Sequence, residues 1–89
     1  MKFEWDPNKS ATNLRKHGVA FSDAVTVLDS DLHAITVSEE GVDDEERYIT
    51  IGTDSVGRVP VVAYTTRGES VRIISARRAN KRERQEYEW

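Results

Sequence analysis

Apolar side chains recur along this chain in two spacings, and these spacings predict its helices and strands. Residues 2–5 alternate between polar and aromatic positions, as expected of a short strand. A helix then begins, with Asp6 as its N-cap and Pro7 as its first helical residue. Gly18 ends this helix, because glycine readily adopts the left-handed backbone conformation found after helices.

A second helix follows, and it carries the clearest amphipathic pattern of the sequence. Ser22 is its expected N-cap, and the segment 29–31 ends it. Its apolar positions are three, four and seven residues apart, which places them on one side of a helix that faces the core. These positions are Phe21, Ala24, Val25 and Leu28.

The second half of the chain is predicted to form antiparallel strands. Residues 47–51, 58–66 and 70–76 are expected strands, and the three- to six-residue connections between them are too short for parallel crossovers. Residues 32–37 are a weaker strand candidate, and residues 38–45 are expected to form an exposed loop.

The last nineteen residues change from a strand into a short, charged helix. The change falls at Arg77 and Arg78, and Asn80 with Glu83 has the spacing of a capping box. The resulting order β-α-α-β-β-β-α predicts one α+β domain over residues 1–89. We expect an antiparallel sheet of about four strands, two N-terminal helices on one face and a short C-terminal helix.

Composition narrows the class of protein. The chain has 89 residues and no Cys, which suits a single domain in the reducing cytoplasm. No apolar run approaches the roughly 20 residues that span a bilayer, and no signal peptide is evident. We therefore expect a cytoplasmic protein without membrane contact.

The net charge of −3 hides an asymmetry along the chain. Residues 1–66 carry six Lys or Arg and twelve Asp or Glu, whereas residues 67–89 carry seven and four. Eight acids and no Lys or Arg lie between Asp29 and Glu46. Such a chain can offer one surface to RNA and another to a basic protein, although both regions can equally be solvated faces.

The side chains available for chemistry are mainly guanidinium groups. His17 and His33 are sixteen residues apart, and no metal-ligand spacing occurs, so we expect no metal or other cofactor. Metal-free RNA cleavage needs a base, an acid and cations that stabilise the phosphorane, and Arg suits the last role. For Arg47, Arg58 and Arg72, each taken alone, pairing with an acid on a solvated sheet face is favoured over a catalytic role. His17 can equally cap the C-terminal end of its helix.

Several short segments closely resemble the BrnT-type toxins, the ribonuclease halves of type II toxin–antitoxin modules. The segments are Phe3–Pro7 (FEWDP), Asn13–Val19 (NLRKHGV), Glu46-Arg47, Ile51-Gly52, Gly57-Arg58, Arg72–Arg77 (RIISAR), Glu83 and Tyr87-Glu88. The resemblance implies a RelE-like fold, metal-independent cleavage of mRNA that inhibits translation, and neutralisation by a BrnA-type antitoxin. It also implies that operator DNA is bound only through the antitoxin, and it allows a homodimer within the complex.

The same resemblance implies a set of site residues. The basic catalytic candidates are Lys16, His17, Arg67 and Arg77, with Glu46 and Tyr87 as proton-transfer partners. In the enzyme hypothesis Arg67 and Arg77 hold the scissile phosphate. The further RNA-binding candidates are Arg47, Arg58, Arg78 and Lys81.

A second hypothesis is a catalytically weak or inactive protein-binding module that acts only as antitoxin partner and co-repressor. The acidic balance and the lack of an evident acid–base pair favour it. Direct DNA binding is disfavoured, because the net charge is negative and no helix-turn-helix pattern occurs.

Overall fold

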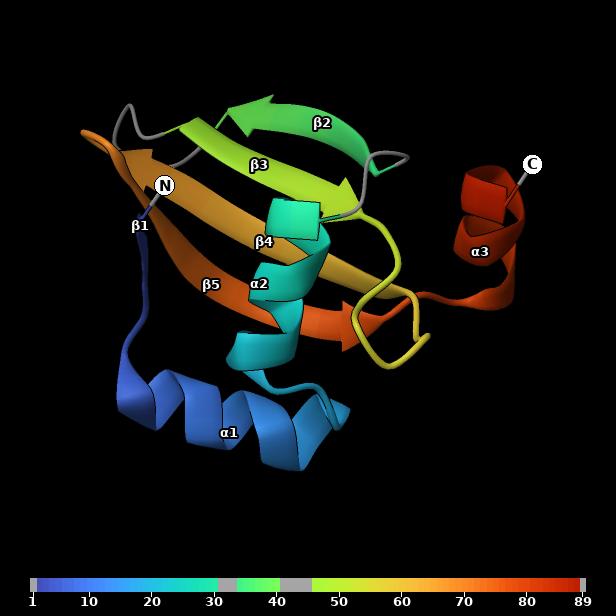
Figure 1. Ribbon diagram of the computed structural model, residues 1–89, viewed down its shortest axis with the longest axis horizontal. Helices are drawn as coiled ribbons and strands as arrows, with labels where there is room; N and C mark the ends of the chain where they lie inside the picture. The colour runs from blue at the N-terminus through green and yellow to red at the C-terminus, as the bar shows by residue number, and fades with distance from the viewer. Residues whose placement is uncertain (1, 31–33, 41–45, 89) are drawn as a thin grey trace.

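The protein is described by a computed structural model over residues 2–30, 34–40 and 46–88. Three helices and five strands follow one another along the described chain (Figure 1). They are β1 (Lys2–Glu4), α1 (Pro7–His17), α2 (Phe21–Ser30), β2 (Ile35–Glu40), β3 (Glu46–Ile51), β4 (Pro60–Arg67), β5 (Ser70–Arg78) and α3 (Lys81–Glu88). Within this part of the chain, no helix combines the length and the apolar character needed to cross a membrane.

The strands form one mixed sheet in the order β1-β5-β4-β3-β2. The predicted meander of β3, β4 and β5 is confirmed, but the expected all-antiparallel sheet of about four strands is wrong, because β1 pairs in parallel with β5. The weaker strand candidate, predicted over residues 32–37, does form a strand, but the strand spans Ile35–Glu40 and pairs with β3. The predicted loop is therefore strand over residues 38–40, and residues 41–45 lie outside the described part.

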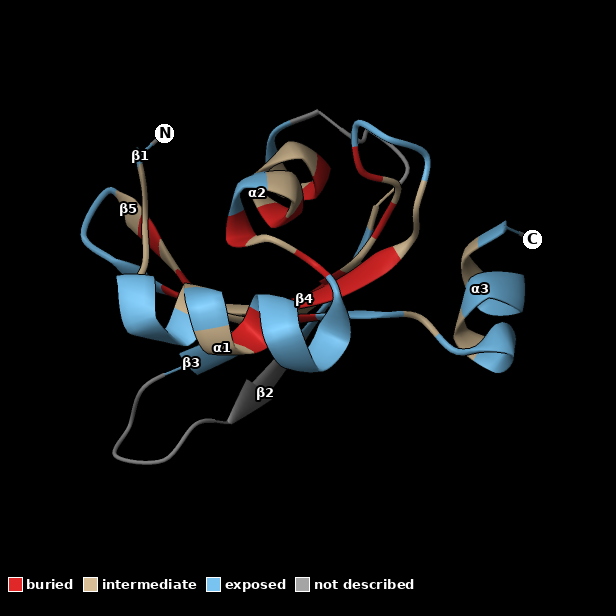
Figure 2. Cartoon of the chain, turned by 90° about the horizontal axis from the view of Figure 1, so that it is seen from below, coloured by how far each residue is buried: buried red, intermediate tan, exposed pale blue. Residues whose placement is uncertain are grey.

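The two N-terminal helices occupy different places. α2 crosses one face of the sheet, whereas α1 lies beside β5, along the edge that the short strand β1 leaves open (Figures 1 and 2). The prediction that both helices cover one face is therefore correct only for α2. The reason is a buried polar side chain in α1, Asn13, which bonds to the backbone of β5 and is described with the site below.

The hydrophobic core lies between α2 and the central strands (Figure 2). Its buried members are Val19, Phe21, Ala24, Val27, Val62, Val71, Ile73 and Ala76. The predicted stripe is confirmed at two of its four positions, whereas Leu28 is partly buried and Val27 takes the place expected for Val25. α2 also begins at Phe21 and not after Ser22, and the carbonyl of Ala20 accepts its first helical hydrogen bonds.

Local capping signals predicted the other helix ends correctly. Asp6 accepts a hydrogen bond from the backbone N–H of Asn8 at 2.8 Å, and Gly18 has φ 70° at the end of α1. Asn80 and Glu83 form the predicted capping box, with reciprocal side-chain-to-backbone bonds of 2.8 and 2.9 Å.

Candidate functional site

The predicted catalytic residues fall at two opposite ends of the sheet. In the β4–β5 hairpin, Arg67 is paired with Ser70 and Arg77 is paired with Val61. Val61 and Arg67 are six residue steps apart along β4, which is about 20 Å of strand. The prediction that Arg67 and Arg77 hold the same phosphate is therefore not supported by the fold. Glu46 starts β3 at the Arg67 end, whereas the end of α1, with Lys16 and His17, lies at the Arg77 end.

A groove between α1 and β5 contains both Lys16 and His17. Its volume is about 330 Å³. Lys9 and Lys16 lie two helical turns apart along it, a separation of about 10 Å. No carboxylate is among the described residues that line it, although the chain as a whole has a net charge of −3. The lining residues are Asn8, Lys9, Thr12, Asn13, Lys16, His17 and Ile74.

The side-chain amide of Asn13 holds α1 in this place. Its Nδ2 donates to the carbonyl oxygens of Ala76 at 2.7 Å and Val19 at 3.0 Å, and its Oδ1 accepts from the N–H of Ala76 at 3.1 Å. Asn13 thus supplies to β5 the donor and the acceptor that a neighbouring strand would otherwise supply. This anchoring fixes the position of the basic last turn of α1 relative to the end of β5.

Arg78 joins this basic end of the molecule. A β-carbon added at Gly18 would lie 3.8 Å from Nη2 of Arg78, so this guanidinium lies against the end of α1. The last turn of α1 consists of Arg15, Lys16 and His17, where positive charge is favoured by the helix dipole. Arg78 therefore lies beside the end of α1, whose last turn carries the groove residues Lys16 and His17.

Arg77, next along the chain, is engaged by α3. Its Nη1 and Nη2 donate to Oε1 and Oε2 of Glu83, both at 2.8 Å, in a two-pronged ion pair. These bonds, helped by the backbone N–H of Asn80, lower the pKa of Glu83 to about 2. The same pair raises the pKa of Arg77. The guanidinium of Arg77 is thus already bound, through both of its outer nitrogens, to a carboxylate.

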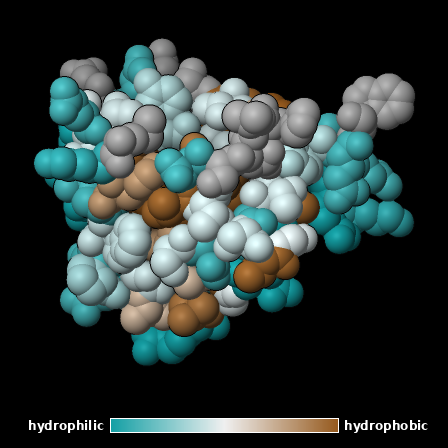
Figure 3. Space-filling view, in the orientation of Figure 1, coloured by the Kyte–Doolittle hydropathy of each residue, from teal (hydrophilic) through white to brown (hydrophobic). Residues whose placement is uncertain are grey.

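Two further candidates lie on α3. Tyr87 is hydrogen-bonded through its hydroxyl to Oγ1 of Thr53 at 2.9 Å, which ties α3 to the loop after β3. Lys81 is exposed in the first turn of α3. No described residue of α3 is buried, and the helix projects as a hydrophilic lobe at one end of the molecule (Figure 3).

Arg58 has a structural role. Its guanidinium donates to Asp54 at 3.0 Å, to Asp23 at 2.7 Å and to the carbonyl oxygen of Gly18 at 3.1 Å. The side chain of Asp54 is fully buried and also accepts two backbone N–H bonds of its own loop. Arg58 therefore joins the loop after β3 to both N-terminal helices, and we do not propose it as an RNA contact.

The opposite end of the sheet carries Glu46, Arg47 and Arg67. The hydroxyl of Tyr48 donates to Oε2 of Glu46 at 2.6 Å, and this hydrogen bond raises the pKa of Tyr48. Arg47 is exposed on β3, opposite Thr65. Because Glu46 lies far from Lys16 and His17 along the strands, it cannot exchange a proton with them directly.

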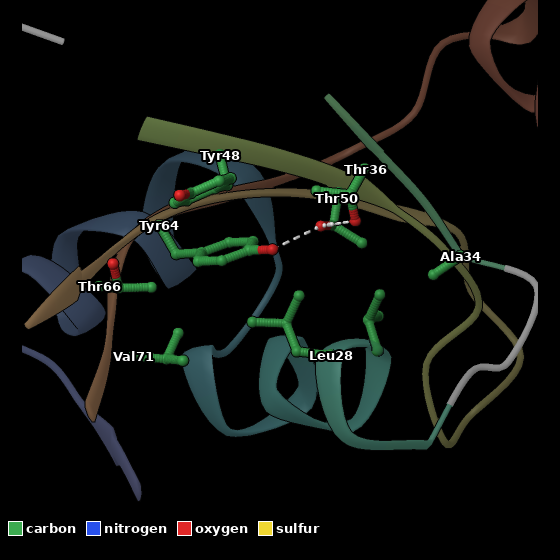
Figure 4. Close-up of a pocket in the computed structure, with 9 residues that line it drawn as sticks. Leu28, Ala34, Thr36, Tyr48, Thr50, Tyr64, Thr66 and Val71 are labelled. Carbon is green, nitrogen blue, oxygen red and sulfur yellow. Dashed lines mark hydrogen bonds between the residues drawn. The ribbon is translucent and has the colours of Figure 1, made fainter. Parts of the chain in front are cut away.

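Beside this end, a cavity of about 440 Å³ opens between α2 and the sheet (Figure 4). Thr36, Thr50 and Tyr64 form a chain of hydroxyl groups in it, joined at 2.7 and 3.1 Å. Tyr64 is stacked on Tyr48 with ring centroids 5.5 Å apart. The other lining residues are apolar or carry hydroxyl groups, so the cavity has no charged wall among the described residues.

Sequence reasoning missed Asn13, Lys9 and Thr12. The signal for Lys9 and Thr12 was present, since with Lys16 they have the spacing of one helix face. His33 lies outside the described residues. Among the residues that the structure does describe, no three His, Cys, Asp or Glu side chains are grouped as a metal site would need.

The fold and the groove define a small α+β protein with a basic groove, in which no described carboxylate takes part, beside β5 of a mixed sheet. Residues 5–83 match the profile of a family described as "Ribonuclease toxin, BrnT, of type II toxin-antitoxin system". The chain belongs to this family of ribonuclease toxins. Membership assigns it a toxin role and implies an antitoxin as its partner.

A solved structure supports the assignment. The chain is similar to the ribonuclease toxin BrnT of Brucella abortus, whose crystal structure was determined at 1.1 Å resolution. The two share 30% sequence identity with a TM-score of 0.73, over 91% of this chain and 99% of that one. Comparison with curated protein sequences gave no significant match.

Proposed function

We propose that this toxin is a metal-independent endoribonuclease that cleaves mRNA, and that the groove between α1 and β5 holds the scissile phosphate. One observation carries the proposal: in an acidic chain, Lys9, Lys16 and His17 line a groove with no described carboxylate, and the guanidinium of Arg78 lies against Gly18, which follows His17. A groove of this composition suits an anion, because lysine and arginine stabilise phosphate charge without a metal ion.

The chemistry assigned to the groove is an internal transfer at phosphorus. A base takes the proton of the ribose 2′-OH, the 2′ oxygen attacks phosphorus, and the bond from phosphorus to the 5′ oxygen breaks as an acid protonates that oxygen. The products are a 2′,3′-cyclic phosphate and a 5′-OH end. We assign proton transfer to His17 and charge stabilisation to Lys16 and Arg78, because they lie together at the end of α1.

Arg77 is assigned the role of a second phosphate ligand. In the free protein its two outer nitrogens hold the two oxygens of Glu83. A phosphate offers the same pair of oxygens to the guanidinium fork, so it can take the place of the carboxylate. Tyr87 and Lys81 lie on the same helix as Glu83 and are proposed as RNA contacts at this end.

Arg67, Arg47 and Glu46 lie too far away to share the scissile phosphate. We propose Arg67 and Arg47 as contacts for RNA beyond the cleaved bond, and Glu46 as the partner that orients Tyr48. Neutralisation is assigned to a BrnA-type antitoxin, which also supplies the operator-DNA contacts. The negative net charge of the toxin is consistent with DNA binding by the antitoxin and not by the toxin.

The experiment is cleavage of a defined mRNA by the purified toxin in excess EDTA. We expect cleavage by the wild type, and a loss of at least about 100-fold in rate for His17→Ala, the usual range for a general acid–base group. A comparable loss is expected for Lys16→Ala, because it removes a charge that stabilises the transition state. Lys2→Ala is the matched control, since it removes one exposed lysine at the far end of the sheet. Cleavage that requires a divalent ion, or that survives both groove variants, would overturn the proposal.

The second candidate is a catalytically weak module that only binds the antitoxin. It is favoured by one observation: Arg77 is already neutralised by Glu83. Expression without antitoxin separates the two candidates. Growth arrest that disappears in Lys16→Ala, with the circular dichroism of the fold unchanged, supports the nuclease. Normal growth and intact RNA with the wild type would support the module.

A further inference from the structure

The groove between α1 and β5 is longer than the proposed cleavage step requires (Figure 1). Lys16 and His17 line one part of it, and Lys9 lies about 10 Å away, two turns earlier in α1. Thr12 also lines the groove and is a neighbour of Lys9, because residues three apart share a helix face. Lys9 and Thr12 have no part in the cleavage step, so they are available to another part of the substrate.

Helix stability does not account for Lys9. The dipole of a helix is positive at its N-terminus, so the first turn favours acidic side chains and disfavours basic ones. The first turn of α1 contains no acid. Asp6 caps the helix, since its carboxylate accepts from the backbone N–H groups of Asn8 at 2.8 Å and of Lys9 at 3.4 Å. The ammonium group of Lys9 has no hydrogen bond or ion pair with any described residue, so its charge is available to an external anion.

Thr12 adds a hydroxyl group beside this lysine. Its Oγ1 accepts a hydrogen bond from Nη2 of Arg15 at 3.4 Å, which leaves the O–H group able to donate to a phosphate oxygen. The same bond brings the guanidinium group of Arg15 next to Thr12. Lys9 and Thr12 therefore offer two donors, with a further cation close by, in a groove that no described carboxylate lines.

A β-bulge in β5 contributes the opposite wall of the groove. Ala63 of β4 pairs with Ser75, and the next residue of β4 pairs with Ile73. Ile74 is therefore an extra residue on β5, where the ladder is interrupted. Ile73 is buried in the core, whereas Ile74 lines the groove. The bulge thus places an apolar side chain across from α1, where it can contact the uncharged sugar or base of a nucleotide.

The number of cations indicates more than one phosphate. A phosphodiester carries a single negative charge, and Lys16 with Arg78 is already assigned to the scissile one. An RNA strand carries one further charge on the next nucleotide, so a cation farther along the same groove suits the neighbouring phosphate. The groove volume of about 330 Å³ lies at the lower end of the range of about 300–1,000 Å³ for small-ligand sites. A groove of this size admits one strand and not a duplex.

We propose that Lys9 and Thr12 form a second phosphate subsite, which binds the phosphate next to the scissile one in a single-stranded RNA that lies along α1. The nucleoside between the two phosphates contacts Ile74. This inference rests on the proposed function, which places the scissile phosphate at Lys16 and His17. Because the contact with Lys9 is the same before and during cleavage, it contributes to substrate binding and not to the rate of the bound complex.

The test is binding of the full-length toxin to a short mixed-sequence oligonucleotide with 2′-O-methyl groups, which cannot be cleaved. Fluorescence anisotropy gives the Kd at several salt concentrations. Lys9→Ala removes the charge, and Lys9→Arg preserves it. Lys2→Ala is the matched control, since Lys2 is exposed on β1 and does not line the groove. Cleavage kinetics with the unmodified RNA, and affinity for the antitoxin, are measured in parallel.

We expect Lys9→Ala to raise the Kd for RNA about tenfold, as the loss of one charge-assisted contact implies. The slope of log Kd against log salt should fall by about 0.7, the value for one phosphate of a single strand. KM should rise about as much as Kd, with kcat unchanged. Lys9→Arg and Lys2→Ala should both behave like the wild type.

An unchanged Kd and salt slope in Lys9→Ala would overturn the inference, even if the RNA is cleaved as proposed. An equal loss in Lys2→Ala would also overturn it, because net charge alone would then explain the effect. A fall in kcat at unchanged KM would instead make Lys9 part of the cleavage step, and a weaker antitoxin complex with unchanged RNA affinity would assign Lys9 to the antitoxin. If the wild type binds RNA without cleaving it, the proposed function fails, and the binding comparison still decides the subsite.

Discussion

Replacing Asn13 tests how the groove between α1 and β5 is built. The side chain is buried and makes three hydrogen bonds, two to Ala76 and one to Val19. In Asn13→Ala, one N–H and two carbonyl groups of the backbone lose their partner. A buried group left without a hydrogen bond destabilises by about 1–3 kcal/mol, so we expect a total loss of about 3–5 kcal/mol.

Asn13→Asp is the more informative change, because it preserves size. Its Oδ1 can still accept from the N–H of Ala76, but the second oxygen replaces the donor and faces two carbonyl oxygens. Burial and these carbonyls raise the pKa of the introduced carboxyl above its value in the unfolded chain. The destabilisation is therefore greatest at neutral pH and shrinks as the pH falls through that raised pKa, where the protonated group can donate again.

Thermal unfolding followed by circular dichroism at pH 7 and pH 4 measures both effects. In a domain of this size, 1 kcal/mol shifts Tm by about 4–8 °C, so Asn13→Ala should lower Tm by about 15–30 °C. Asn8→Asp is the control, since Asn8 is exposed in the first turn of the same helix. The reasoning is refuted if Asn13→Asp at pH 7 lies within about 1 kcal/mol of the wild type, or if its deficit does not shrink at pH 4.

Three further changes test the remaining contacts. Arg58→Ala leaves the buried carboxylate of Asp54 without its ion pair. It should lower the unfolding free energy, measured in urea, by about 3 kcal/mol and leave RNA affinity unchanged. Unchanged stability with a loss of RNA affinity would contradict the structural role of Arg58. Glu83→Gln should lower stability at pH 7 by about 1 kcal/mol, less than the full pKa shift implies because the ion pair with Arg77 is partly exposed. Since the pKa of Glu83 is lowered to about 2 from 4.5, this difference is complete above pH 4.5 and should fade as the pH falls toward 2; a difference independent of pH would refute the ion pair as its source. Gly18→Ala should cost about 1 kcal/mol in thermal unfolding, because φ is 70° there, and no loss would contradict that conformation.

The features predicted correctly from the sequence depend on neighbours along the chain. The N-cap at Asp6, the terminator Gly18 and the capping box of Asn80 with Glu83 all involve residues within four positions of one another. Their geometry follows from local hydrogen bonding, so it can be inferred without the fold. The meander of β3 to β5 was predictable for the same reason, because short connections permit only antiparallel neighbours.

The features that were missed depend on distant contacts. β1 pairs with β5 across nearly 70 positions, and Asn13 bonds to Ala76 across 63. Nothing in the local pattern around Asn13 distinguishes a buried amide from an exposed one. The acids that pair with Arg58 could likewise not be predicted from the sequence, since one of them lies 35 positions away. The separation of Arg67 from Arg77, by contrast, follows from the hairpin itself, because one precedes the turn and the other ends the next strand.

The central claim is that an RNA phosphate binds between α1 and β5, at one end of the sheet. It is tested most directly by ¹H–¹⁵N NMR titration of the toxin with a short oligonucleotide that has 2′-O-methyl groups and cannot be cleaved. The account predicts saturable shifts at Lys16, His17, Gly18 and Arg78. Shifts confined to Glu46 and Arg67, at the other end of the strands, would contradict it.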